Sequence, residues 1–141
     1  MKLHTYLNFN GTCAQAFAYY EKHLGAKITS SMTYGQMPGA TSLPPGQENL
    51  ILHARIAVGD TYLMASDVPP TMPWEPMRSA YLTLNVDSSA EAEGIHAALA
   101  DGGQIFMPLQ ETFYAHKFSM LRDRFGINWM VIHEKPMPTP A

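Results

Sequence analysis

Short segments with alternating hydrophobic and polar residues recur along the chain, and longer segments between them have a helical period. Between the first two alternating segments, apolar residues recur at helical spacing from Cys13 to Leu24. Thr12 and Gln15 are spaced as a capping box for this helix, and Gly25 suits the left-handed residue that ends one. In the first half the pattern predicts four strands, over residues 4–9, 26–34, 50–58 and 61–66.

The second half repeats this order of elements. A capping box at Ser88 and Glu91 predicts the start of a second helix, and Gly102 predicts its end. Residues 7–10, Leu-Asn-Phe-Asn, match Leu-Asn-Val-Asp at 84–87, and the same offset carries Gly25 onto Gly102. Strands are predicted over residues 80–86, 104–109, 113–121 and 127–133. Two duplicated βαβββ halves, which together make an α+β fold, explain this pattern.

The predicted boundaries follow the prolines. We expect a single domain of two modules, with residues 1–67 as the first and residues 80–134 as the second. Residues 68–79 form a proline-rich linker, because four prolines exclude a continuous helix or a central strand there. Residues 135–141 should be a loose tail. The long segment 35–49, rich in glycine and proline, is typical of a lid or binding loop.

Composition excludes several classes of function. The formal net charge is -3 and the few lysines and arginines are scattered, so no nucleic-acid partner is expected. Cys13 is the only cysteine, which excludes an intramolecular disulfide and a multi-thiolate zinc site and favours a reducing compartment. No run of about 18 apolar residues and no signal-peptide pattern occur, so we expect a cytoplasmic protein with no membrane partner.

Four stretches of the sequence carry a family resemblance. The most specific are Gln-Glu-Thr-Phe at 110–113 and Asp-Arg-Phe-Gly at 123–126, followed by Trp129. Tyr-Leu-Asn-Phe-Asn-Gly at 6–11 and residues 18–26 are moderately specific. With these motifs the chain resembles the PhnB-like branch of the vicinal-oxygen-chelate superfamily, the glyoxalase, bleomycin-resistance and dioxygenase group. The resemblance implies curved mixed sheets around a small-molecule pocket, and a homodimer.

The resemblance also bears on cofactors. Metal-dependent members of the superfamily hold a divalent ion, and His4 falls where the family places its first histidine ligand. The other family positions fall approximately on Leu63 and Met64, Tyr81 and Met130, none of which is a hard-metal or imidazole ligand. We therefore expect no metal site and no cofactor. Relatives often carry a demethylubiquinone methyltransferase label, yet this sequence has no glycine-rich strand-to-helix fingerprint.

The segment with the strongest family match also holds candidate catalytic residues, Glu111 and His116, and candidate pocket residues, Thr112, Tyr114 and His116. Glu111, Tyr114 and His116 offer a carboxylate, a phenol and an imidazole within six residues. If the segment is extended, Tyr114 and His116 share a face, with Thr112 beside them. The alternative is an exposed bulge or turn with solvated charges. His4 is a further candidate, as a general base or a relic ligand, or else a partly exposed strand residue.

Aromatic residues are candidates for the walls of a ligand pocket. Tyr62 and Trp129 occupy equivalent places in the closing hairpins of the two halves, so each could stack on a flat ligand, although core packing explains them as easily. Trp74, among the linker prolines, could close the pocket or cover a partner subunit.

The leading functional hypothesis is a protein that binds a small organic ligand in an apolar, aromatic-lined pocket. One alternative is a metal-assisted enzyme of the glyoxalase, lyase or dioxygenase type, which needs a bound ion or an acid–base pair from Glu111 and His116. The other is an antibiotic-sequestering protein of the resistance type. The sequence leaves open which ligand binds and whether any reaction follows.

Overall fold

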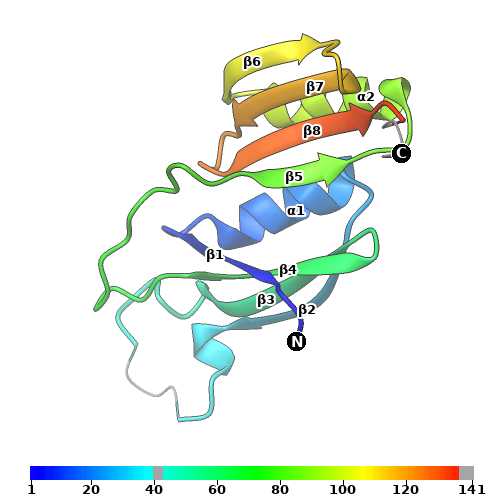
Figure 1. Cartoon of the computed structure of the whole chain (residues 1–141). Coiled ribbons are helices and arrows are strands. Elements are labelled where there is room, and N and C mark those ends of the chain that lie inside the picture. Colours follow the sequence, from blue (N-terminus) through cyan, green and yellow to red (C-terminus); the bar gives the residue numbers. More distant parts are fainter. Residues whose placement is uncertain (40–42, 137–141) are drawn as a thin grey trace. The chain divides into compact units, whose positions relative to one another are not determined.

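The computed structural model describes residues 1–39 and 43–136, which form two compact units, Met1–Glu75 and Pro76–Ala141. Each unit holds one helix and one four-stranded mixed sheet, in the order expected of a βαβββ module (Figure 1). The predicted α+β fold class is therefore confirmed. Most of the predicted tail, residues 137–141, lies outside the described residues. Neither α-helix of the described residues has the length and apolar character needed to cross a membrane.

The first unit builds its sheet in the order β1-β4-β3-β2, with β1 parallel to β4 and the other neighbours antiparallel. Gly25 and Gly59 have φ values of 65° and 58°, which explains glycine at the end of the helix and in the β3–β4 turn. The elements are β1 (Thr5–Phe9), α1 (Cys13–His23), β2 (Lys27–Thr33), the 3₁₀ turn η1 (Tyr34–Gln36), β3 (Ile51–Val58) and β4 (Thr61–Asp67).

Alternation along these strands divides the first sheet into two faces. Leu7 and Phe9 of β1 are buried against α1, where the rings of Phe9 and Phe17 meet edge to face with centroids 6.3 Å apart. Tyr6 and Asn8, which alternate with these residues along β1, point to the opposite face. We call this opposite face, which points away from α1, the distal face.

The start of α1 differs from the sequence prediction. Thr12 is the N-cap residue, but its side chain forms no capping hydrogen bond. The carboxylate of Asp67, at the end of β4, takes this role: its Oδ1 accepts hydrogen bonds from the backbone N–H groups of Gly11 and Cys13, each at 3.0 Å. Its Oδ2 accepts a third from the N–H of Ile51, at 2.9 Å. A strand residue 54 positions from Cys13 thus caps the helix, which local spacing could not reveal.

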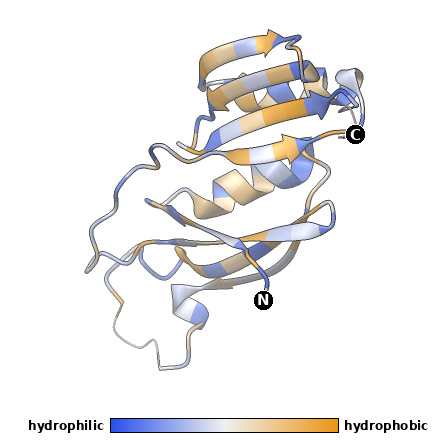
Figure 2. Ribbon diagram, viewed as in Figure 1, coloured by the Kyte–Doolittle hydropathy of each residue, from blue (hydrophilic) through white to orange (hydrophobic). Residues whose placement is uncertain are grey.

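The second unit repeats the topology with the order β5-β8-β7-β6, again with a parallel first pair. Here the predicted helix start is confirmed at Ser88, whose side chain accepts a hydrogen bond from the N–H of Glu91 at 3.1 Å. The middle of β8 is hydrophobic and its two ends are hydrophilic (Figure 2). The elements are β5 (Leu82–Asn85), α2 (Ser89–Ala100), β6 (Gln104–Gln110), β7 (Ala115–Arg122) and β8 (Asn128–Glu134).

Contacts with α2 show which side chains of the second sheet face the helix. Ser119 of β7 lies 2.9 Å from His96, and His133 of β8 lies 3.1 Å from Ser89. Trp129 shares this face by alternation, is 1% exposed and donates its indole N–H to Oδ2 of Asp123 at 2.9 Å. Trp129 is therefore a core residue of the second unit, because the strand register turns it toward α2.

Cys13 illustrates how deeply the start of α1 is buried. Its thiol is inaccessible, and burial, followed by the charge of Asp67, raises its pKa from 9.0 to about 12. In the unfolded chain the thiol ionises near pH 9, whereas in the folded chain it stays neutral up to a higher pH. The contribution of this pKa difference to the free energy of unfolding is fully present below pH 9 and is lost between about pH 9 and 12. We expect the stability difference between the wild type and Cys13→Ala to shrink by about 1.4 kcal/mol per pH unit above pH 9.

Urea titrations of both proteins at pH 8, 9, 10 and 10.5 measure this difference, and the variant corrects for the tyrosines and lysines that titrate in the same range. A difference that stays constant across this series would contradict the raised pKa of Cys13.

Candidate functional site

The distal face of the first sheet gathers aromatic and basic side chains. Because β4 lies between β1 and β3, its Tyr62 projects between the side chains of these two neighbours. The cluster draws on the start of β1, on β3 and on β4, and consists of His4, Tyr6, His53, Arg55 and Tyr62.

Tyr62 is the centre of this cluster. The ring of His4 stacks on it with centroids 3.9 Å apart and an interplanar angle of 19°. The guanidinium carbon of Arg55 lies 4.2 Å from the centroid of the same ring, which is the geometry of a cation–π contact. Both basic groups are therefore held within about 4 Å of one aromatic ring, which fixes their positions on the face.

A second pair adjoins the first on the same strands. The hydroxyl oxygen of Tyr6 lies 3.2 Å from Nδ1 of His53, and their ring centroids are 5.8 Å apart. At the other end of the face, the hydroxyl of Ser66 donates to Oδ1 of Asn8 at 3.2 Å. These polar groups satisfy one another, which distinguishes them from the groups around Tyr62.

Two nitrogen atoms of the Tyr62 group have no hydrogen-bond partner in the described residues, although both are buried. They are Nδ1 of His4 and Nε of Arg55. A buried donor without an acceptor costs about 1–3 kcal/mol, and more when the group is charged. Native proteins satisfy most such groups, so the unsatisfied pair sets the Tyr62 group apart from the other polar groups of this face.

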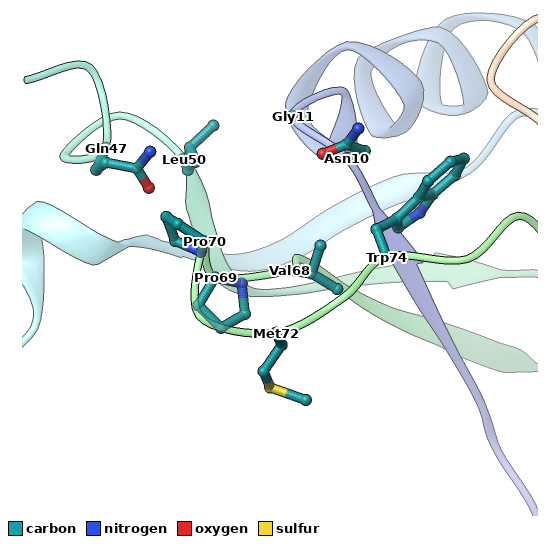
Figure 3. Close-up of a pocket in the computed structure, with 9 residues that line it drawn as sticks. All are labelled: Asn10, Gly11, Gln47, Leu50, Val68, Pro69, Pro70, Met72 and Trp74. Atoms are coloured by element: carbon teal, nitrogen blue, oxygen red, sulfur yellow. The ribbon is translucent and has the colours of Figure 1, made fainter. Parts of the chain in front are cut away.

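A pocket of about 370 Å³ lies beside the ends of β1 and β4 in the same unit (Figure 3). Trp74 lines it, and its indole N–H donates to the carbonyl oxygen of Asn8 at 3.1 Å. Figure 3 shows Gln47 and Leu50 on the side of the pocket opposite Trp74. The full lining is Asn10, Gly11, Gln47, Leu50, Val68, Pro69, Pro70, Met72 and Trp74. The wall thus combines part of the predicted binding loop with the proline-rich linker.

The candidate residues of the second unit do not converge. Residues 111–114 form a turn, in which Thr112 accepts a hydrogen bond from the N–H of Ala115 at 3.0 Å, and the β7–β8 register shifts just after it. The ring of Tyr114 contacts Phe118, whereas that of His116 lies 4.8 Å from His133. The extended conformation that would place Tyr114 and His116 on one face is therefore absent from this segment.

Glu111 is engaged in an ion pair. Its Oε2 lies 2.8 Å from the ammonium group of Lys135. The hydrogen bond from Lys135, together with its positive charge, holds the pKa of Glu111 below the ordinary value. The carboxylate is consequently ionised at neutral pH and exposed, which agrees with the solvated-charge alternative for this segment.

Trp129 is placed differently from its counterpart Tyr62. Both are candidates for pocket walls by their equivalent places in the sequence, but Trp129 faces α2 in the core and Tyr62 lies on the distal face. The face of the second sheet that points away from α2 is instead lined by Phe118 and Ile132, with methionines packed around them. Core packing, the alternative considered for Trp129, describes its position.

The donor set does not fit a divalent ion at the inherited position. No group of three or more His, Cys, Asp or Glu side chains that could hold a metal occurs within residues 1–39 and 43–136. Near His4, the β4 residues are Met64 on the distal face and Leu63, which is buried against α1. Thioether and aliphatic groups are poor ligands for hard cations, so these side chains do not complete a metal site with His4.

Arg55 and His53 belong to the cluster but were not among the residues proposed from the sequence. The signal was present in Ile-Leu-His-Ala-Arg-Ile-Ala-Val, residues 51–58, where a strand that pairs on both sides carries an arginine. An arginine in a central strand must either reach solvent or meet a partner. Sequence alone could not tell which, because Tyr62 contacts it from another strand.

Comparison with known proteins places this site in context. A model of the family described as 3-demethylubiquinone-9 3-methyltransferase matches residues 1–132. Protein YjdN of Escherichia coli (strain K12) is 36% identical over 151 residues, covering 99% of this chain and 99% of that protein.

Solved structures agree with this match. Protein PA1353 from Pseudomonas aeruginosa is 43% identical, with a TM-score of 0.87, covering 96% of this chain and 99% of that one. The PhnB protein from Bacillus cereus is 25% identical, with a TM-score of 0.76 and coverage of 94% and 99%. A glyoxylase/bleomycin resistance protein/dioxygenase domain from Frankia shares the fold at 16% identity, with a TM-score of 0.59 and coverage of 96% and 98%.

Proposed function

The chain belongs to the PhnB-like family of the vicinal-oxygen-chelate superfamily, and we propose that it binds a small organic ligand on the distal face of its first unit. The observation that carries the proposal is the pair of buried, unpartnered nitrogens at His4 and Arg55, both held against Tyr62. A ligand with acceptor atoms would satisfy them.

Binding without a metal is the form of the proposal that the donor set favours. The positions that would complete a metal site around His4 carry no suitable side chain in the described part of the chain. The name of the matching family describes a methyltransferase. The sequence has no glycine-rich strand-to-helix motif that would support a dinucleotide-type cofactor site, so methyl transfer is not part of the proposal.

The pocket beside Trp74 belongs to the same proposal as a neighbouring subsite. Asn8 connects the two regions, because its side chain accepts from Ser66 while its carbonyl accepts from Trp74. A volume of about 370 Å³ is at the lower end of the range for small-molecule sites. The homodimer and the cytoplasmic location expected from the sequence stay predictions.

Fragment binding observed by NMR tests the proposal. We expect small aromatic fragments to shift the backbone resonances of β1, β3 and β4, and Tyr62→Ala to weaken their binding about tenfold, because the variant loses the ring that positions both basic groups. Tyr19→Ala on α1 is the matched control, since this partly exposed tyrosine lies on the helix and contacts His23. Fragments that bind Tyr62→Ala as tightly as the wild type would exclude the distal face as the site.

A further inference from the structure

Basic groups dominate the distal face, whereas two carboxylates of the first unit, Asp67 and Glu21, are engaged elsewhere. Asp67 faces α1 and the strand ends, and Glu21 of α1 accepts a hydrogen bond from the N–H of Ile28 at 2.7 Å. In the described residues Arg55 forms no ion pair. Arginine is almost always charged, and Nε of Arg55 is buried without an acceptor in the described residues, so the guanidinium retains an unused donor.

We propose that the ligand of the distal face carries an oxyanion, a carboxylate or a phosphate group, which pairs with the guanidinium of Arg55 and accepts a hydrogen bond from its Nε. This inference rests on the proposed function and specifies its ligand class. A planar guanidinium binds an oxyanion through two parallel N–H groups, and Nε is one of the donors that such a pair uses.

The surroundings select the rest of the ligand. Met64 is paired with Arg55 across the β3–β4 ladder and with Tyr6 across β1–β4, so a thioether lies on the same face between basic and aromatic groups. Methionine side chains adapt to apolar ligands of different shapes. Arg55 is partly exposed as a whole residue, so the site borders solvent. The ligand class is therefore a small organic acid with an apolar body.

Simple probes separate this inference from the proposed function. Benzoate and phenyl phosphate carry the two forms of oxyanion on the same apolar ring, and benzamide is the neutral counterpart of benzoate. We expect NMR titrations in 50 mM salt to give dissociation constants for one or both anions that are at least about tenfold lower than for benzamide, because a charge-assisted hydrogen bond is roughly twice as strong as a neutral one. Whichever anion binds more tightly distinguishes a carboxylate ligand from a phosphate ligand.

Arg55→Gln should remove this preference, and Arg122→Gln is the matched control. Arg122 also contacts an aromatic ring, with its guanidinium carbon 5.1 Å from the centroid of Phe106. Its Nε, however, already donates to Oδ1 of Asn128 at 2.9 Å. The control variant should keep the preference for the anions.

The outcomes are distinct. Equal affinity for benzoate, phenyl phosphate and benzamide, or an anion preference that persists in Arg55→Gln, overturns the inference of an oxyanion ligand. It leaves the proposed function intact if the neutral probe still shifts β1, β3 and β4. If neither the charged nor the neutral probes shift these strands, the proposed function fails and the inference fails with it.

Discussion

Replacing Asp67 by alanine is expected to lower the free energy of unfolding by about 4 kcal/mol. The carboxylate, 1% exposed, accepts hydrogen bonds from three backbone N–H groups, those of Gly11, Cys13 and Ile51. Alanine leaves these donors without an acceptor, and each unsatisfied buried donor costs about 1–3 kcal/mol. It also frees the start of α1 from the end of β4, so helix and sheet lose their shared anchor.

Urea denaturation followed by circular dichroism measures this loss, with Asp60→Ala as the control. Asp60 is exposed in the β3–β4 turn, and its replacement should change stability by less than about 0.5 kcal/mol. The stability loss of Asp67→Asn should lie between those of Asp67→Ala and Asp60→Ala. The carbonyl oxygen of the asparagine can still accept from Gly11 and Cys13, while its amide group faces the N–H of Ile51. A loss below about 1 kcal/mol for Asp67→Ala would show that the carboxylate is not the anchor.

The second large effect is expected at Asp123, where alanine should cost about 3 kcal/mol. Its Oδ1 accepts from the N–H groups of Phe125 and Ile127 at 2.9 and 3.0 Å, which closes the β7–β8 turn. Its Oδ2 accepts from the buried indole of Trp129. Removing the carboxylate leaves an indole N–H and a buried backbone N–H unsatisfied in the core of the second unit.

A double-mutant cycle with Trp129→Phe isolates the indole contact. In the phenylalanine background the indole donor is gone, so Asp123→Ala should cost about 1 kcal/mol less than in the wild type. Asp101→Ala provides the control, because its exposed ion pair with Arg124 at 3.1 Å is worth at most about 1 kcal/mol. Additive losses in the cycle would contradict a specific carboxylate–indole interaction.

Most of the fold could be predicted from residue patterns. Alternation located the strands and the glycines located the helix ends, because both signals act over a few residues. The helix starts show where local signals fail. Ser88 caps α2 within its own sequence, whereas α1 is capped by Asp67 from the far end of the module. Thr12 carries the local motif, and yet a stronger acceptor from β4 takes its role.

The site was less predictable, because it depends on contacts across strands. His4 and Tyr62 were proposed separately, and only the β1–β4 register brings their rings together. Arg55 was not proposed, since its partner ring lies on a different strand. Conversely, the turn at residues 111–114 separates Tyr114 from His116, although their spacing would place them on one face of a strand.

The two tryptophans lie one in each compact unit, and this gives the chain two internal optical reporters. Trp74 is 37% exposed beside a pocket, whereas Trp129 is 1% exposed in a core. An indole in contact with water fluoresces at longer wavelengths than a buried one, so the two emissions separate. A variant that keeps only one of the two tryptophans reports the unfolding of the unit that holds it. Comparing the two single-tryptophan variants would show whether the halves lose their structure together or one after the other.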